Sequence, residues 1–224
     1  MLKLVVNSPK GGVGKTTVAT NTALLLAAEG KKVLVLKLSS SSGIIEHIKA
    51  KQQDNPNLYK SITIADEDKL NPDDVQGLPT DFKGMGEHDI VVADTDDYWK
   101  ILEKLVDKKR IGWRVIAPIV PNDIEGLERI PGELSTIVTQ SVIKKFPLKL
   151  TIVPNRCGDN NGIEDDINIV KAKLEQKGLL NKLSAYYLPY AGRNYPPIFI
   201  ENNDIFRQQL KLILSHECQI DFNQ

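Results

Sequence analysis

Residues 7–17 read NSPKGGVGKTT, and this stretch decides the fold of the chain. Before it, Leu2 to Val6 is a short aliphatic run of the kind that forms a buried strand. After it, Val18 to Ala28 has the composition of a helix and is followed by Gly30, a residue type that commonly ends helices. A strand, a glycine-rich loop and a helix in this order predict a phosphate-binding loop.

The residues of this loop suit a nucleotide. Glycine backbone can curl so that successive N–H groups point at an anion, and the helix N-terminus adds partial positive charge. We expect Lys15 to reach the β- and γ-phosphates and the Thr16 hydroxyl to ligate Mg²⁺. The strict pattern G-x-x-x-x-G-K-[ST] is not met, because Pro9 stands five residues before Gly14. A second lysine, Lys10, directly precedes the glycine pair instead.

The sequence KGGVGKTT at residues 10–17 resembles the deviant Walker-A loop of the ParA/MinD family of ATPases. Within that family the chain looks most like the small plasmid-type ParA partition proteins. The resemblance implies that Lys10 reaches across a nucleotide-sandwich dimer to the partner's phosphates and that Lys15 acts with it in catalysis. It also implies that the whole loop binds ATP, through Lys10, Gly11, Gly12, Val13, Gly14, Lys15, Thr16 and Thr17. The alternative, a glycine-rich turn with chance lysines, does not explain the strand and the helix on either side.

Length and composition set limits on the other possibilities. The 224 residues are 41% hydrophobic and 26% charged, which suits one globular domain over residues 1–224. Basic and acidic residues both number 29, so overall charge favours no partner. Cys157 and Cys218 stand far apart, which favours a reduced, cytoplasmic protein without a disulfide framework or an iron–sulfur cluster. The longest apolar run, Ala23 to Ala28, is too short to span a bilayer, and no signal peptide is visible.

Apolar strands alternate with helical segments along the chain, which predicts an α/β fold with a mostly parallel, doubly wound sheet flanked by helices. With the loop at residues 7–17, the resemblance implies that this fold is a P-loop NTPase. Three local expectations follow from turn-forming residues. Residues 52–57 should break the helix that starts at Ile44, Pro118 should end the strand that starts at Arg114, and residues 159–161 should cap the helix that contains Ile163. Pro131 should kink the helix at 126–138 or mark a restart.

A second nucleotide motif follows the strand at 89–93. Asp94 comes directly after Val91-Val92-Ala93, the Walker-B arrangement in which a carboxylate leaves the strand tip beside Mg²⁺ and its waters. We therefore predict Thr16 and Asp94 as metal ligands, with Asp94 also catalytic. The family resembled here continues D-T-P-P, whereas this chain has Asp96 and Asp97. These two carboxylates are either solvated loop residues or substitutes for acids that are missing elsewhere.

The first switch of the family, D-x-D-P-Q-G, has no acid in this chain, where Lys37 to Gly43 reads KLSSSSG. The resemblance implies that the second missing aspartate would have helped to position the attacking water. Losing one such group costs on the order of 10²–10³ in rate. We therefore expect normal MgATP binding with slow hydrolysis. The alternative is that Asp94, with Asp96 or Asp97, restores ordinary turnover.

Two later segments resemble the base-binding parts of the family. Thr151 to Arg156 reads TIVPNR, and the resemblance implies that the Asn155 amide reads the adenine edge. The alternative for Asn155 is an Asx turn after the strand. In the segment at 188–190, LPY, the resemblance implies that Pro189 lies along the base.

Together the resemblance implies an ATP-dependent homodimer that binds MgATP and hydrolyses it slowly while partitioning plasmid or chromosomal DNA, or positioning a cargo on the nucleoid. It also implies non-specific DNA binding, a ParB-like adaptor and a cytoplasmic, nucleoid-associated location. Basic residues at 100–114, 141–149 and 193–211 are either solvated surface or DNA contacts. The alternative function is an ATP-sensing scaffold that recruits a partner without hydrolysis. A MinD-like membrane role is disfavoured because residues 215–224 are acidic and lack lysine.

Overall fold

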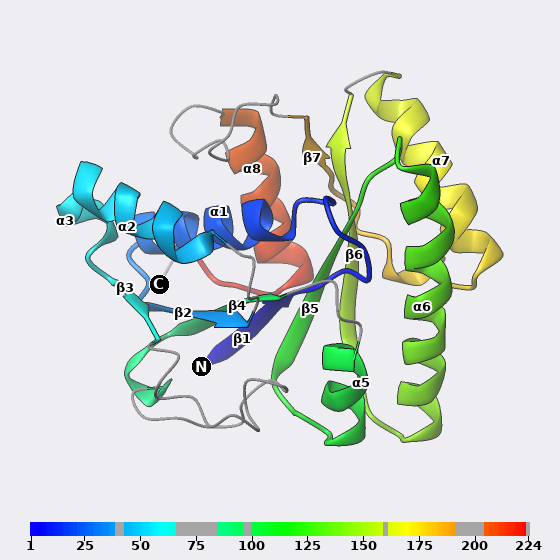
Figure 1. Cartoon of the computed structure of the whole chain (residues 1–224), viewed down its shortest axis with the longest axis horizontal. Coiled ribbons are helices and arrows are strands. Elements are labelled where there is room, and N and C mark those ends of the chain that lie inside the picture. The colour runs from blue at the N-terminus through cyan, green and yellow to red at the C-terminus, as the bar shows by residue number, and fades with distance from the viewer. Residues whose placement is uncertain (39–42, 66–84, 96–99, 159–160, 191–203, 223–224) are drawn as a thin grey trace.

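The computed structural model describes residues 1–38, 43–65, 85–95, 100–158, 161–190 and 204–222, and all structural statements below concern these residues. Seven parallel strands form one sheet in the order β3-β2-β4-β1-β5-β6-β7 (Figure 1). The strands are β1 Leu2–Val6, β2 Val33–Leu38, β3 Ile62–Ile64, β4 Ile90–Thr95, β5 Trp113–Ile119, β6 Lys149–Cys157 and β7 Leu188–Pro189.

Helices cover both faces of this sheet, which confirms the predicted doubly wound α/β architecture. One face carries α1 Lys15–Ala28, α2 Ile44–Asp54, α3 Pro56–Tyr59 and α8 Asp204–Leu212, the last continued by a π-helical turn at Ile213–Glu217. The other face carries α5 Lys100–Asp107, α6 Ile124–Ile143 and α7 Ile163–Gln176. Short 3₁₀ turns lie at Met85–Glu87 and Leu180–Lys182.

Successive residues of a strand supply the two hydrophobic clusters in turn. In β2, Val33 and Val35 pack in the cluster beneath α1, whereas Leu34 and Leu36 pack in the cluster beneath α5 and α6. Burial on both sides explains why the strands of a covered parallel sheet read as near-continuous aliphatic runs. The parity of a strand position therefore tells which face of the sheet its side chain joins.

The strand order places the glycine-rich loop at the centre of one sheet edge. β1 lies between β4 and β5, and the chain leaves its carboxyl end into residues 7–14 and then into α1. The carboxyl ends of β4, β6 and β7 meet the same edge because all the strands are parallel. Ligands of open α/β sheets bind at such an edge, where the strand order reverses.

One of the two expected breaks is confirmed and the other is wrong. The helix from Ile44 ends at Asp54 and Asn55 leaves the helical path, within the expected 52–57, and Pro56 then takes the first position of α3, where its missing N–H costs nothing. Pro118 lies inside β5, paired with Val153. Backbone groups of a strand alternate in direction, so residue 118 faces the β1 side as Ile116 does, and pairing with β1 ends at Ile116. Pro118 has no backbone N–H, but none is needed on that side, so the proline removes no hydrogen bond between β5 and β1.

The helix caps also differ from expectation. α6 begins at Ile124, two residues earlier than predicted, because the Asp123 side chain accepts a hydrogen bond from the backbone N–H of Gly126. Pro131 lies within this one continuous helix. Asn161 does not cap α7: its amide donates to Asn122 Oδ1, and Gly162 is the cap residue. The other two expected caps, Asp159 and Asn160, lie outside the described residues.

Both cysteines, Cys157 and Cys218, are buried and free. Burial raises the pKa of the Cys157 thiol and of the Cys218 thiol to about 12 each. Both thiols therefore stay protonated at neutral pH, which makes them inert core residues.

Candidate nucleotide-binding site

The loop between β1 and α1 has the backbone conformation that its glycines allow. Gly12 and Gly14 have φ angles of 75° and 92°, in the left-handed region that other residues avoid. Gly14 is also the N-cap residue of α1, so the helix N-terminus opens directly onto the loop. This arrangement of a curled backbone and a helix N-terminus provides inward-facing N–H groups and partial positive charge for an anion.

Asn155 supports this loop from β6. Its side-chain Nδ2 donates to the carbonyl oxygen of Val13 at 2.7 Å, and the residue is buried. A Cβ atom on Gly14 would lie 2.5 Å from that same Nδ2, so position 14 has no room for a side chain. The alternative of an Asx turn is wrong, because Asn155 lies within β6 and bonds a distant loop. Its role toward adenine stays a prediction.

The predicted phosphate and metal residues lie together at the start of α1. Lys15 is 7% exposed, and its ammonium group donates to the carbonyl oxygen of Lys10 at 2.7 Å. The Thr16 hydroxyl donates to Asp94 Oδ2 at 2.9 Å, and Asp94 is fully buried at the end of β4. A hydroxyl and a carboxylate in contact are the pair that Mg²⁺ binds beside nucleotide phosphates.

A short hydrogen-bond chain ties this end of β4 to the beginning of the loop. Asn7 Nδ2 donates to the Thr95 hydroxyl at 2.7 Å, and that hydroxyl donates to the carbonyl oxygen of Val6 at 2.8 Å. Asn7 and Thr95 are both buried. These bonds hold the end of β1, where the phosphate loop begins, next to the end of β4, directly after the Walker-B carboxylate.

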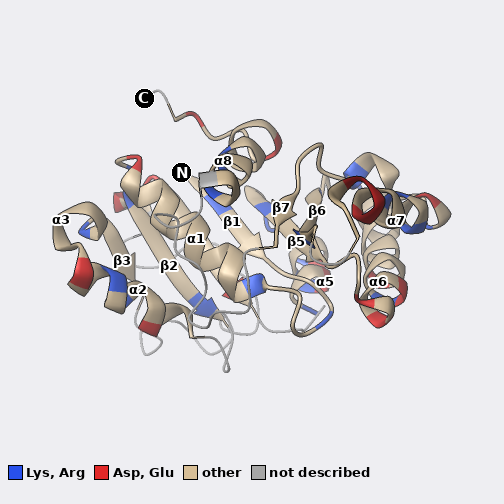
Figure 2. Cartoon of the chain, turned by 90° about the horizontal axis from the view of Figure 1, so that it is seen from above, with Lys and Arg blue, Asp and Glu red and all other residues tan. Residues whose placement is uncertain are grey.

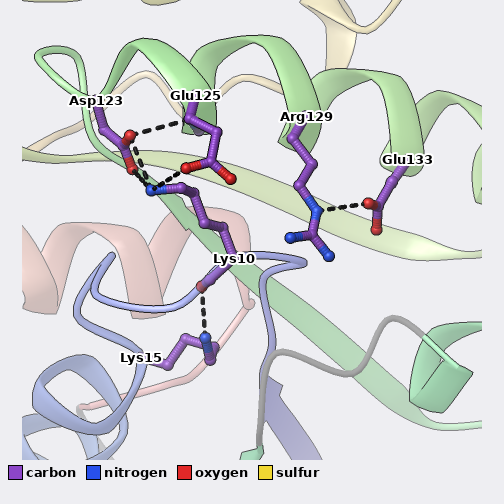
Figure 3. Close-up of polar contacts among 7 residues, drawn as sticks. Lys10, Lys15, Asp123, Glu125, Arg129 and Glu133 are labelled. Atoms are coloured by element: carbon purple, nitrogen blue, oxygen red, sulfur yellow. Dashed lines mark hydrogen bonds and ion pairs between the residues drawn. The ribbon is translucent and has the colours of Figure 1, made fainter.

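Lys10 bonds the N-terminus of α6 in the same chain (Figure 3). Its ammonium group lies 2.9 and 2.8 Å from the two carboxylate oxygens of Asp123 and 3.5 Å from Glu125 Oε2. The hydrogen bond to Asp123 raises the pKa of Lys10. Burial tends to raise the pKa of Asp123, but the hydrogen bonds from Lys10 and from the Gly126 backbone outweigh it, so this pKa is lowered. Both groups therefore stay charged over the neutral range.

Asp123 and Glu125 were not found by sequence reasoning, which started the helix at Gly126. The signal was present: Asp123 stands three residues before Gly126 and immediately before an apolar helical pattern, as an N-cap should. Nothing in the local sequence, however, indicates that the same carboxylate would meet a lysine 113 positions away.

Some of the remaining predicted site residues lie at the same sheet edge, and others lie outside the described residues. Pro189 follows Leu188, which pairs with Asn155, so the β6–β7 pairing brings Pro189 to the same edge. Gly11 and Thr17 are partly buried in the loop and the first turn of α1. The switch serines 39–42, and also Asp96 and Asp97, lie outside the described residues. The contacts that each site residue makes with a nucleotide stay predictions.

The residues present fit a nucleotide with a divalent cation. The space denied to a side chain at Gly14, the Lys15 ammonium group bonded to the loop and the Thr16–Asp94 contact make a cradle for a polyphosphate. Among the described residues, no cluster of three or more His, Cys, Asp or Glu side chains can hold a metal by itself. A cation at this site would accordingly depend on Thr16, Asp94 and the phosphates together.

The basic residues considered as DNA contacts are partly engaged within the chain. Arg207 and Lys211 on α8 pair with Glu29 at 3.4 and 2.9 Å, and Lys144 pairs with Asp107. Blue and red segments both occur over α7 in Figure 2, where the first turn carries Glu164, Asp165 and Asp166 and the last turn carries Lys173. Arg193 lies outside the described residues.

Comparison with known families decides the identity of the fold. The sequence profile described as "CobQ/CobB/MinD/ParA nucleotide binding domain" matches residues 4–186. The chain belongs to this family. Membership in the CobQ/CobB/MinD/ParA family agrees with the parallel sheet and the glycine-rich loop, and it confirms the P-loop NTPase fold expected from residues 7–17. Comparison with curated proteins gives no match.

Three solved structures show how the fold extends over the whole chain. A plasmid partition protein from Borrelia burgdorferi has a TM-score of 0.62 at 17% identity, with 97% of this chain and 98% of that chain covered. Apo McdA from Cyanothece has a TM-score of 0.64 at 16% identity, covering 96% and 99%. Cobyrinic acid a,c-diamide synthase from Mycobacterium smegmatis, with bound ADP and magnesium, has a TM-score of 0.61 at 16% identity, covering 96% and 95%. At these identities the likeness concerns the fold.

Among the described helices, none combines the length and the apolar character that crossing a membrane would need.

Proposed function

We propose that this chain is a ParA-type ATPase, which binds MgATP, dimerises when loaded, and partitions DNA or positions a cargo on nucleoid DNA. The observation that carries the proposal is the pair of lysines, Lys10 and Lys15, on one loop whose glycine backbone and helix N-terminus suit a polyphosphate. The fold is shared with a plasmid partition protein, which supports the partitioning role.

Each loop residue has a proposed task. Backbone N–H groups of residues 11–17 would hold the phosphates, with Lys15 neutralising the terminal ones. Thr16 and Asp94 would hold Mg²⁺, whose chemistry is to neutralise charge on the transferred phosphoryl group. Asn155 and Pro189 would bound the base, and Lys10 would leave Asp123 to contact the partner's nucleotide. Hydrolysis would be slow because the segment after β2 lacks an acid to orient water.

The partners follow from the same proposal. The ATP-bound homodimer would bind DNA without sequence preference, and a ParB-like adaptor would stimulate its hydrolysis on the nucleoid in the cytoplasm. Phosphate contacts made by Lys and Arg release counterions, so DNA binding should weaken steeply with salt. Retention on DNA that ignores salt, or that does not need ATP, would contradict this part.

The decisive experiment is the Lys10→Ala variant. We expect calorimetry with ATP and Mg²⁺ to give an affinity close to that of the unchanged protein, because Lys10 bonds α6 rather than the loop of its own subunit. We expect light scattering with a non-hydrolysable ATP analogue to show a dimer for the unchanged protein and a monomer for Lys10→Ala. Lys149→Ala, which removes an exposed lysine at the start of β6, is the matched control. A normal ATP-dependent dimer of Lys10→Ala would contradict the assignment of this chain as a ParA-type ATPase.

A second function is favoured by one observation. Lys37 stands on β2 beside Asp94, where an acid would favour turnover, so the chain can be an ATP-sensing scaffold that recruits a partner and does not hydrolyse. Phosphate release under saturating ATP and Mg²⁺ separates the two. Slow release that disappears in Lys15→Ala supports the ATPase, and no release above the Lys15→Ala background supports the scaffold.

A further inference from the structure

Lys37 and Asp94 occupy matching positions on neighbouring strands. In the parallel β2–β4 pair, Val33 is opposite Ile90, Val35 opposite Val92, and Lys37 opposite Asp94. Residues in register on adjacent strands direct their side chains to the same face of the sheet. The first two pairs pack in the cluster beneath α1, so Lys37 and Asp94 belong to the α1 face as well.

The same face carries the predicted metal ligands. Asp94 is fully buried and accepts a hydrogen bond from Thr16 at the first turn of α1. Lys37 is partly buried near the end of β2. Neighbouring strands lie only about 4.8 Å apart, a distance that the four-carbon stem of a lysine can bridge. A lysine therefore stands on the strand next to the buried carboxylate that we expect a divalent cation to use.

A cation in this place changes what Mg²⁺ can contribute. A buried carboxylate is costly unless a positive charge or hydrogen bonds compensate it, and a lysine at the register position opposite Asp94 is placed to supply such a charge. An ammonium group reaching Asp94 from this position would repel a divalent ion at Thr16 and Asp94, since nearby like charges disfavour each other in a poorly solvated site. It would also attract the phosphates that the ion would otherwise neutralise.

We propose that Lys37 is a built-in cation of the nucleotide site, which takes over part of the charge neutralisation that Mg²⁺ provides. Nucleotide binding by this chain then depends only weakly on Mg²⁺. The proposal rests on the proposed function, because it concerns how the same site holds ATP. It assigns to Lys37 a role in metal dependence that the loop residues alone do not predict.

The test compares ATP affinity in Mg²⁺ with ATP affinity in EDTA, by calorimetry. Three proteins are measured: the unchanged chain, Lys37→Met, which keeps a long stem without charge, and Lys149→Met, which removes an exposed lysine from another strand. We expect the two affinities of the unchanged chain and of Lys149→Met to agree within a few-fold. For Lys37→Met we expect the ratio to rise about tenfold or more, the usual effect of one nearby charge on an ionic equilibrium.

A nucleotide-free readout keeps the test independent of turnover. Mg²⁺ alone should raise the melting temperature of Lys37→Met, because the ion then compensates Asp94, and should leave that of the unchanged chain where it is. Lys37→Arg, which retains the charge, should behave as the unchanged chain does.

The inference is overturned if Lys37→Met keeps the same Mg²⁺-to-EDTA ratio as the unchanged chain. It is also overturned if the unchanged chain binds ATP more than about a hundredfold more weakly in EDTA than in Mg²⁺. A different result removes the proposed function itself: no ATP binding by the unchanged chain or by Lys149→Met in either buffer.

Discussion

At the scale of single residues, the contact between Gly14 and Asn155 shows how a strand far along the chain shapes the loop. The Asn155 amide occupies the space that a side chain at position 14 would need, and it bonds the adjacent Val13 carbonyl oxygen. The glycine is thus required for two separate reasons, its φ of 92° and the close approach of Asn155.

Gly14→Ala tests this double requirement against Gly12→Ala. Position 12 also has a left-handed φ, but a Cβ there would meet nothing within 4 Å. We expect Gly12→Ala to show only the backbone strain, about 1 kcal/mol. We expect Gly14→Ala to lose a further ~1–3 kcal/mol of unfolding free energy, because the buried amide must give up its bond to Val13. Urea denaturation measures both, and equal losses would contradict the contact.

The identity of the loop residues was predictable, since KGGVGKTT combines residue types that have few other uses together. Their partners were not. Lys10 meets Asp123, and Asn155 meets Val13, across 113 and 142 positions of sequence. Such contacts depend on strand order, and the alternation of strands and helices predicts a parallel sheet without fixing that order.

At the scale of elements, α1 is the helix that ties the nucleotide loop to the C-terminal part of the chain. Its cap residue Glu29 places a carboxylate at the negative end of the helix dipole, an unfavourable position. Lys211 and Arg207 on α8 compensate this charge, and Figure 2 shows α1 and α8 side by side. The hydrogen bond from Lys211, with that from Arg207, lowers the pKa of Glu29 against the effect of burial.

The Glu29 contact should contribute stability only while the carboxylate is charged. Because its pKa is lower in the folded state, the contribution is present at neutral pH and is lost as the pH falls through that lowered value. Glu29→Gln should therefore cost about 0.2–1 kcal/mol at pH 7, a small amount because the cations are partly exposed. Thermal melts at pH 7 and in acid should show this difference shrinking in acid. Glu175→Gln, exposed on α7, is the control and should show no such trend.

Element boundaries were less predictable than element types. Pro118 was expected to end β5, yet it lies where β5 needs no donor, and Pro56 opens α3 directly after the break at Asn55. In both cases the tertiary surroundings decide whether a missing N–H matters, and a local pattern contains no information about them.

At the scale of the whole molecule, the proposed dimer requires a change in the contacts of Lys10. Within one chain its ammonium group is held by Asp123 and Glu125, so it must leave them before it can reach a partner's phosphates. The side chains of Lys10 and Asp123 are 18% and 23% exposed, so breaking their ion pair has a small free-energy cost. Dimerisation driven by nucleotide binding would then have to overcome the free energy of this contact within the chain.

Asp123→Asn should shift dimerisation to lower nucleotide concentration. Asparagine can still accept the hydrogen bond from Gly126 as an N-cap, so α6 keeps its start while Lys10 loses its charged partner. Since a partly exposed pair is worth about 0.2–1 kcal/mol, the concentration of a non-hydrolysable analogue that gives half dimer should fall by up to about fivefold. Light scattering over an analogue titration measures this concentration. Glu133→Gln, which breaks the pair with Arg129 at 2.7 Å on the same helix, is the matched control and should leave the midpoint unchanged. A midpoint that rises in Asp123→Asn would mean that the carboxylate positions Lys10 for the partner rather than holding it back.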